Sequence, residues 1–231
     1  MQAHASLLTC NQKHKRVLNV GFGMGIIDTA LQEYDPSLHI IIEAHPDVYN
    51  EMKKMKWLEK ENVRVCFGKW QDVIPQLIQE GVKVDGIFYD TYGEHFLDLE
   101  DFHSHALPEL LDTPNGVYSF FNGLAPDNLF FHGVACQCVK LQLASLGFEA
   151  EFVPCEITVP EQEEWEGIRR KYWHGRDTYY LPHVTWKATD ETTTTSSSIE
   201  GEEEEKIKAV ASRQENDDNG MNAKRQKVNE S

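Results

Sequence analysis

Three glycines alternate with apolar residues in Gly21-Phe22-Gly23-Met24-Gly25, directly after the apolar run RVLNV. Glycine lets the backbone turn tightly and approach a ligand with no Cβ in the way. The spacing differs from the G-x-G-x-x-G pattern of dinucleotide sites, and no lysine lies between Val17 and Asp28, as a G-x-x-x-x-G-K-[ST] phosphate loop would need. The segment therefore predicts a ligand-binding turn of another kind.

Two carboxylates and one aromatic–polar segment follow later apolar runs. Glu43 lies eighteen residues beyond Gly25 and can accept hydrogen bonds from both hydroxyls of a ribose, as in sites for NAD or for S-adenosylmethionine. The segment FGKWQD, residues 67–72, can flank an adenine ring, and Asp90 ends the run VDGIFYD. Each carboxylate alone could simply cap the next helix. Their joint occurrence at successive strand ends favours a nucleoside site.

Strand and helix patterns alternate along residues 16–147 and predict an α/β domain. Strands are expected at 16–20, 38–44, 63–68, 84–90, 115–123, 149–159 and 177–188, and helices at 25–35, 46–61, 71–81, 98–112 with a bend at Pro108, and 128–147. The fold class predicted is a doubly wound, mostly parallel seven-stranded sheet that ends in an antiparallel strand pair. In such sheets ligands bind beyond the carboxyl ends of the strands, where the four segments would meet.

Composition divides the chain into a folded domain, residues 1–187, and an acidic tail, residues 188–231, predicted to be disordered. The formal net charge of −16 argues against a duplex nucleic acid partner. No run approaches the ~20 apolar residues of a membrane span, and the first residues do not resemble a signal peptide. We therefore expect a soluble intracellular protein. AKRQK at 223–227 is either a nuclear import signal or a solvated basic cluster.

Two groups of residues suggest a metal site and are interpreted otherwise. Cys136 and Cys138 lack a second pair spaced to complete a site. The histidines and aspartates of 95–105 are expected to form the solvated polar face of a helix. No metal is predicted.

The segments VLNVGFGMGIIDT, IIEAHPDV, GKWQDV, DGIFYDTYGE and PNGVYSFFNG together resemble the class I S-adenosylmethionine-dependent methyltransferases. They are most similar to the branch that holds guanidinoacetate N-methyltransferase and the fungal and plant enzymes that methylate the δ-nitrogen of protein arginine. The resemblance covers Met1 to Trp186.

The resemblance implies S-adenosylmethionine as cofactor and a set of site residues. Residues 22–27 would surround its methionine moiety, Glu43 to His45 the ribose and adenine, Trp70 and Gln71 the adenine, and Asp90 the methyl-transfer centre as the catalytic residue. The cofactor-binding set is Gly21, Phe22, Gly23, Met24, Gly25, Ile26, Ile27, Glu43, Ala44, His45, Trp70, Gln71 and Asp90. Tyr92, equally suited to packing, and His95 are expected near the centre.

One departure from the family is visible. Relatives carry a Trp-Glu pair before the first strand, whose glutamate is a second carboxylate on the guanidino group, and MQAHASLL resembles only the end of that segment. The expectation is an N-terminally shortened chain in which cofactor binding survives better than catalysis.

The leading hypothesis is methylation of the δ-nitrogen of arginine in a basic, ribosomal-type protein by a monomer in the cytoplasm and nucleus, without direct contact to nucleic acid or membrane. Guanidinoacetate is the alternative substrate. A cofactor-binding domain without catalytic activity is a second hypothesis. An NAD-dependent oxidoreductase is a third, which the glycine spacing disfavours.

Overall fold

The computed structural model describes residues 1–126, 128–157, 166 and 178–188. Met1–Lys187 forms a compact unit. The segment predicted to be a disordered tail, with its AKRQK cluster, lies outside the described residues apart from Ala188. In the described part of the chain, no helix is long and apolar enough to cross a membrane.

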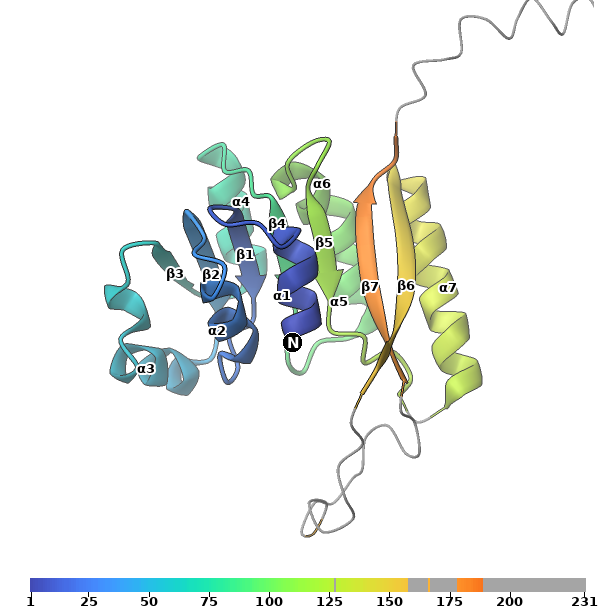
Figure 1. Cartoon of the computed structure of the whole chain (residues 1–231), viewed down its shortest axis with the longest axis horizontal. Helices are drawn as coiled ribbons and strands as arrows, with labels where there is room; N and C mark the ends of the chain where they lie inside the picture. Colours follow the sequence, from blue (N-terminus) through green and yellow to red (C-terminus); the bar gives the residue numbers. More distant parts are fainter. Residues whose placement is uncertain (127, 158–165, 167–177, 189–231) are drawn as a thin grey trace, which may run out of the picture. The chain divides into compact units, whose positions relative to one another are not determined.

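In the part of the chain that the structure describes, seven strands form one sheet in the order β3-β2-β1-β4-β5-β7-β6. Figure 1 shows this sheet. The five strands from β3 to β5 run parallel, and β7 pairs antiparallel with both β5 and β6. The predicted fold class is confirmed. The strands are β1 (Arg16–Val20), β2 (Leu38–Glu43), β3 (Val63–Phe67), β4 (Gly86–Tyr89), β5 (Val117–Phe120), β6 (Phe148–Glu156) and β7 (Thr178–Trp186).

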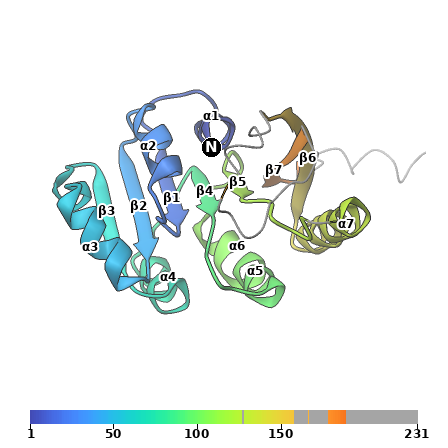
Figure 2. The same ribbon diagram turned by 90° about the horizontal axis from the view of Figure 1, so that it is seen from below.

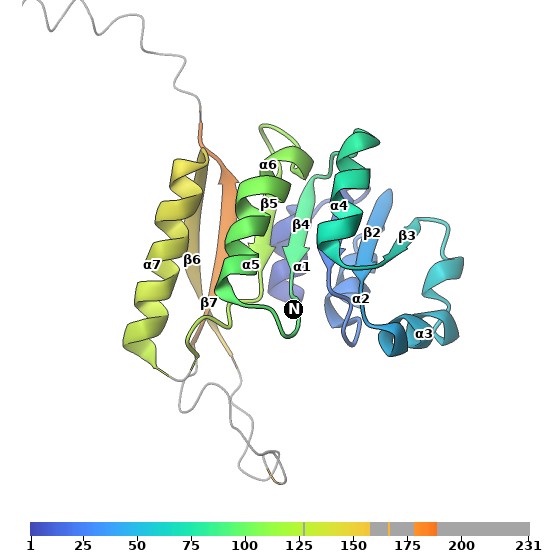
Figure 3. The ribbon, with the colours of Figure 1, turned by 180° about the vertical axis from the view of Figure 1, so that it is seen from behind.

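Helices cover both faces of the sheet because the central strands carry apolar residues on both sides. Val17 of β1 packs with α1 (Gln2–Thr9) and α2 (Ile26–Gln32), whereas its neighbour Leu18 belongs to the large core on the opposite face. Figure 2 shows α1 and α2 on one side of the sheet, and Figure 3 shows the helices of the other side from behind. These are α4 (Trp70–Gln79), α5 (Phe96–Asp101), α6 (Leu107–Leu110) and α7 (Leu129–Ser145).

The helix predicted at 46–61 is shorter than expected. Helix α3 (Pro46–Lys54) ends before Lys56, whose φ of 60° breaks the helix, and a 3₁₀ turn, Trp57–Glu59, follows. The turn brings Trp57 into a cluster with Phe22 and Met52, where it is 4% exposed. Burial of that indole outweighs the helical preference of the segment.

The helix predicted at 98–112 is present but irregular. Between α5 and α6 the segment Phe102–Ala106 is π-helical. Pro108 has no backbone N–H and its ring crowds the carbonyl four residues earlier, so the wider turn before it accommodates the proline. The irregularity expected at Pro108 is therefore a π-helical turn just before the proline.

Helix α1 was not among the predicted elements. It lies against the sheet through Ala5 and Leu8, which pack on Phe88 and Val117. Cys10, with φ of 51°, ends it in a left-handed cap. This helix supplies His4 to the interior.

Candidate functional site

A cavity of about 810 Å³ opens at the carboxyl ends of β1, β2 and β4 and the start of α4. This is the edge at which ligands of open α/β sheets bind. Its lining includes nine of the predicted residues, which are Gly21, Gly23, Met24, Glu43, Ala44, His45, Trp70, Gln71 and Asp90. The structure thus brings the four sequence segments together.

The glycine turn requires glycine at its first position. Gly21 has a φ of 97°, and a Cβ there would lie 2.1 Å from the carbonyl oxygen of Asp90. The backbone of the turn therefore contacts the end of β4 directly. Gly25, with φ of 69°, begins α2, and a Cβ on it would meet the ring of Phe22 at 2.5 Å. Neither position has room for a side chain.

Glu43 joins the end of β2 to the glycine turn. Its Oε2 accepts hydrogen bonds from the backbone N–H groups of Phe22, at 2.9 Å, and Gly23, at 3.3 Å. Its Oε1 accepts one from the N–H of His45 at 2.6 Å. Glu43 is 7% exposed and lines the cavity, and the three hydrogen bonds fix the orientation of its carboxylate. Charge-assisted bonds of this kind hold a turn in one geometry.

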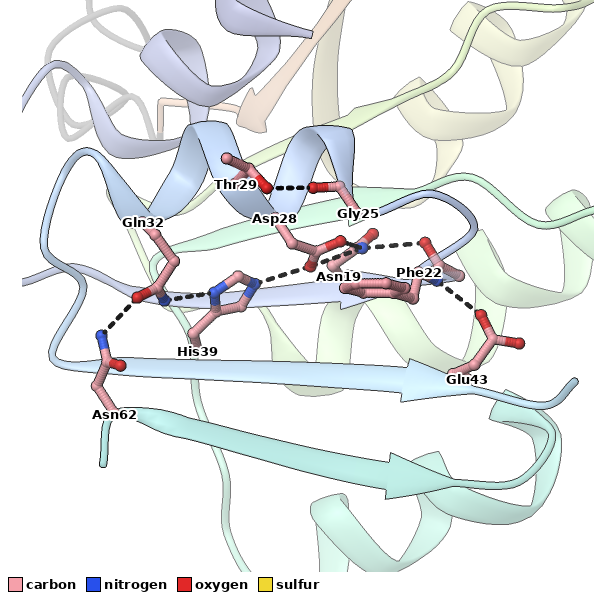
Figure 4. Close-up of polar contacts among 10 residues, drawn as sticks. Asn19, Phe22, Gly25, Asp28, Thr29, Gln32, His39, Glu43 and Asn62 are labelled. Atoms are coloured by element: carbon pink, nitrogen blue, oxygen red, sulfur yellow. Dashed lines mark hydrogen bonds and ion pairs between the residues drawn. The ribbon is translucent and has the colours of Figure 1, made fainter. Parts of the chain in front are cut away.

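A buried chain of polar side chains supports the same turn from behind, as Figure 4 shows. The amide of Asn19 donates to the carbonyl of Gly21 at 3.0 Å and to both oxygens of Asp28. Asp28 lies 3.0 Å from Nε2 of His39, and both side chains are fully buried. Gln32 lies 2.9 Å from the other ring nitrogen of His39. These contacts tie β1, β2 and α2 together below the turn.

Asp90 is the least compensated charge in the site. Within the described residues its carboxylate receives no hydrogen bond, and burial raises its pKa to about 6. It lines the cavity beside Gly21 and Gly23. A half-buried carboxylate without a donor favours either a proton or a cation. Asp90 can therefore bind a cationic group and take a proton from it.

Glu94, which was not among the predicted site residues, organises the loop after β4. Its Oε1 accepts from Nε1 of Trp70 at 2.8 Å and Nε2 of Gln71 at 3.2 Å, and its Oε2 accepts from the hydroxyls of Tyr89 and Thr91. Trp70 itself is 6% exposed and contacts the rings of Tyr89 and Phe102. The prediction placed Trp70 at the adenine, and the structure shows that its indole N–H donates to Glu94 within the protein.

Four predicted cofactor-binding residues are not among the lining residues of the cavity. Ile27 is 3% exposed in the cluster under α1, Phe22 packs on Trp57, Gly25 caps α2, and Ile26 is 56% exposed. Of these four, Phe22 and Gly25 are in contact within the turn itself. Tyr92 lines the cavity and is fully exposed, so of the two alternatives for this ring the structure contradicts packing.

The suggested metal ligands point to different partners. His103 is buried and lies within hydrogen-bond distance of Gln142 and Tyr118, so the expectation of a solvated face is wrong for this residue. His105 is exposed beside Asp101. Across the described residues, no three His, Cys, Asp or Glu side chains are arranged to hold a metal ion.

His4 of α1 lies beneath the end of β5. Its Nδ1 is 2.8 Å from the hydroxyl of Ser119, and its Nε2 is 3.1 Å from that of Tyr179. The Tyr179 hydroxyl also accepts from the backbone N–H of Asn122 at 2.8 Å. Burial lowers the pKa of His4 to about 3, so the ring is neutral. Helix α1 thereby fixes the sheet end next to the cavity, and no local sequence pattern indicates this.

Comparison with known families gives one match to a family model. The model described as guanidinoacetate N-methyltransferase matches residues 1–127. The matched part contains the glycine turn, Glu43, Asp90 and Glu94.

Three curated relatives are 40–46% identical to this chain over 168–193 residues. A protein named protein arginine N-methyltransferase 2 from Yarrowia lipolytica is 43% identical over 193 residues, 80% of this chain and 40% of its own length. Proteins of the same name from Emericella nidulans and Saccharomyces cerevisiae are 46% and 40% identical over 72% and 73% of this chain. The chain spans about two fifths of the length of these relatives.

Solved structures share the fold at low sequence identity. An O-methyltransferase, TomG from Streptomyces achromogenes, solved with S-adenosylmethionine, matches with a TM-score of 0.55 and 16% identity, over 81% of this chain and 79% of its own. Fibrillarin from Aeropyrum pernix, with natively bound S-adenosyl-L-methionine, matches with a TM-score of 0.50 and 11% identity, over 79% of this chain and 73% of its own. The fold is that of the class I methyltransferases.

Proposed function

Because the chain belongs to the guanidinoacetate N-methyltransferase family, we propose that it transfers a methyl group from S-adenosylmethionine to a guanidino nitrogen. The proposed acceptor is the δ-nitrogen of an arginine in a protein. The observation that carries the proposal is Asp90, a carboxylate without a hydrogen-bond donor among the described residues, at the rim of the glycine turn.

The lining residues suit this cofactor chemically. The Glu43 carboxylate faces the cavity next to the turn, where it can accept from ribose hydroxyls, and Ala44, His45 and Gln71 offer small and polar surface to a purine. No atom lies within 4 Å of the position that a Cβ on Gly23 would take, and Gly21, Gly23 and Asp90 line the cavity together, so a sulfonium centre can lie beside Asp90. S-Adenosylmethionine, when bound, supplies an electrophilic methyl group and keeps the electron pair of the broken S–C bond.

The acceptor is the difficult partner in this reaction. A guanidinium has a pKa above about 12, and its lone pairs are delocalised. A carboxylate that accepts two of its N–H bonds holds the planar group in one orientation. As the new N–C bond forms, the methylated nitrogen becomes acidic and Asp90 takes its proton. A pKa of about 6 for Asp90 suits this step because a base works best near the operating pH.

A basic protein is the proposed partner. The formal charge of −16 favours association with an arginine-rich surface such as that of a ribosomal protein. Action as a monomer in the cytoplasm and nucleus, without direct contact to nucleic acid, is part of the same proposal.

Guanidinoacetate is the second candidate acceptor, and the description of the matching family model favours it. Both acceptors present the same guanidinium to Asp90, so a direct competition separates them. We would incubate the chain with labelled S-adenosylmethionine and either an arginine-rich peptide or guanidinoacetate, and identify the methylated nitrogen by mass spectrometry. Methylation of the peptide at the δ-nitrogen supports the first candidate. Binding of S-adenosylhomocysteine without transfer to either acceptor would contradict the catalytic proposal and leave a cofactor-binding domain.

A further inference from the structure

Glu94 connects the start of α4 to the end of β4, two segments that line the cavity. Its carboxylate, half-buried in the loop between β4 and α5, accepts four hydrogen bonds. Two donors, Trp70 and Gln71, begin α4, and the other two, Tyr89 and Thr91, flank Asp90. A carboxylate accepts and cannot donate, so every partner is forced to present a hydrogen atom to it.

This requirement fixes the orientation of the Gln71 amide. Nε2 of Gln71 lies 3.2 Å from Oε1 of Glu94, so the nitrogen end of the amide faces the carboxylate. The other end, Oε1 of Gln71, accepts no hydrogen bond from any described residue. Gln71 is exposed and lines the cavity next to Gly68 and Lys69. An amide that could otherwise donate or accept is therefore left as an acceptor.

The purines differ in what they present to such an acceptor. Adenine carries a 6-amino group, which donates, and hypoxanthine carries a 6-oxo group, which accepts. A carbonyl oxygen binds the first and repels the second. Exchange of the amino group for the oxo group places two hydrogen-bond acceptors against each other, and a site built to accept a hydrogen bond discriminates against a ligand that cannot donate one.

We propose that Glu94 is a positioning residue that holds Gln71 as a hydrogen-bond acceptor and so makes the cavity selective for a 6-amino purine over a 6-oxo purine. The inference rests on the proposed function, because it takes the purine of the cofactor to lie at Gln71. It adds to that function a residue that lines the same cavity and sets cofactor specificity through Gln71.

The test compares the dissociation constants of S-adenosylhomocysteine and S-inosylhomocysteine by calorimetry with the full chain. For the unmodified protein we expect at least tenfold tighter binding of the adenosine compound, the effect of about one hydrogen bond. In Glu94→Leu that preference should fall by about tenfold, because the Gln71 amide is free to turn over. Glu94→Gln should retain most of it, since its carbonyl oxygen still accepts from Trp70 and Gln71. Glu100→Leu, an exposed change on the neighbouring helix α5, is the matched control.

A double mutant shows whether Glu94 changes the purine preference through Gln71. If Glu94 acts through Gln71, then Gln71→Met alone removes the preference, and Glu94→Leu added to it changes the preference no further. A general disturbance of the fold would lower the affinities for S-adenosylhomocysteine and S-inosylhomocysteine together and leave the ratio of the two unchanged. A preference that survives in Gln71→Met overturns the inference, even where Glu94→Leu does not fold.

The outcomes separate the two proposals. Binding of S-adenosylhomocysteine with the same preference in Glu94→Leu as in the unmodified chain overturns the inference and leaves the proposed function standing. Binding of neither compound by the unmodified chain overturns the proposed cofactor site and the inference with it.

Discussion

Replacement of Asp90 by asparagine removes a negative charge that the described fold buries without a hydrogen-bond donor. Burial raises the pKa of this carboxyl from the ordinary 3.8 to about 6. The folded protein therefore binds a proton at Asp90 more tightly than the unfolded chain does. The free energy of unfolding falls as the pH rises from about 4 to about 6 and stays lower above that range.

The size of the effect follows from the pKa. A rise from 3.8 to about 6 corresponds to about 3 kcal/mol of stability lost above about pH 6. Asparagine has the shape of the acid and no charge to desolvate. We expect Asp90→Asn to be more stable than the unmodified chain at about pH 8, by up to about 3 kcal/mol, and equally stable near about pH 4.

Urea unfolding at both pH values, without cofactor, measures the difference. Glu100→Gln, an exposed carboxylate on α5, is the control and should change stability little at either pH. The same Asp90→Asn protein should bind S-adenosylhomocysteine within a few fold of normal and transfer no methyl group. Equal or lower stability of Asp90→Asn at about pH 8 would refute the reasoning, because it would mean that the carboxylate has a stabilising partner.

Three further changes test other parts of the structure. Gly21→Ala, whose Cβ would lie 2.1 Å from a carbonyl oxygen, should lose about 3 kcal/mol of stability and the binding of S-adenosylhomocysteine, whereas Gly81→Ala, with positive φ but open space, should lose about 1 kcal/mol in chemical unfolding. Glu43→Gln cannot accept all three backbone N–H bonds and should weaken S-adenosylhomocysteine binding at least tenfold by calorimetry, a result that unchanged affinity would contradict. Burial lowers the pKa of His103 to about 4, so stability should fall as the pH drops from about 6.5 to about 4, and His103→Gln should flatten that fall in urea unfolding at about pH 7 and about pH 4.5.

Strands were easier to predict than the ends of helices. A parallel strand buried on both faces reads as an unbroken apolar run, and LHIIIE and GIFY have that form. Helix α1 has no such mark, because its short segment is stabilised by contact with Phe88 and Val117, residues more than seventy positions away. The end of α3 at Lys54 was equally hidden from the sequence, because it depends on the burial of Trp57 in the core.

The site was predictable only as far as the sheet topology determines it. Parallel strands end at one edge, so the glycine turn, Glu43 and Asp90 had to meet there. Glu94 lies four residues past Asp90, and its role depends on donors that come from α4 and β4. No spacing in the sequence encodes a hydrogen bond between segments that only the fold brings together. For the same reason the use of the Trp70 N–H by Glu94 could not be foreseen.

The position of β7 has a consequence for the order of assembly. Among the strands that the structure describes, β6 pairs only with β7, and β7 lies between β6 and β5. A nascent chain that has emerged only as far as Glu156 holds β6 without a neighbour, and β5 with one edge unpaired. Such edges invite pairing with other chains. Residues 178–186 complete the sheet beside β5, and they are synthesised after all of the cavity-lining residues. A chaperone would have most to protect in the interval between the two.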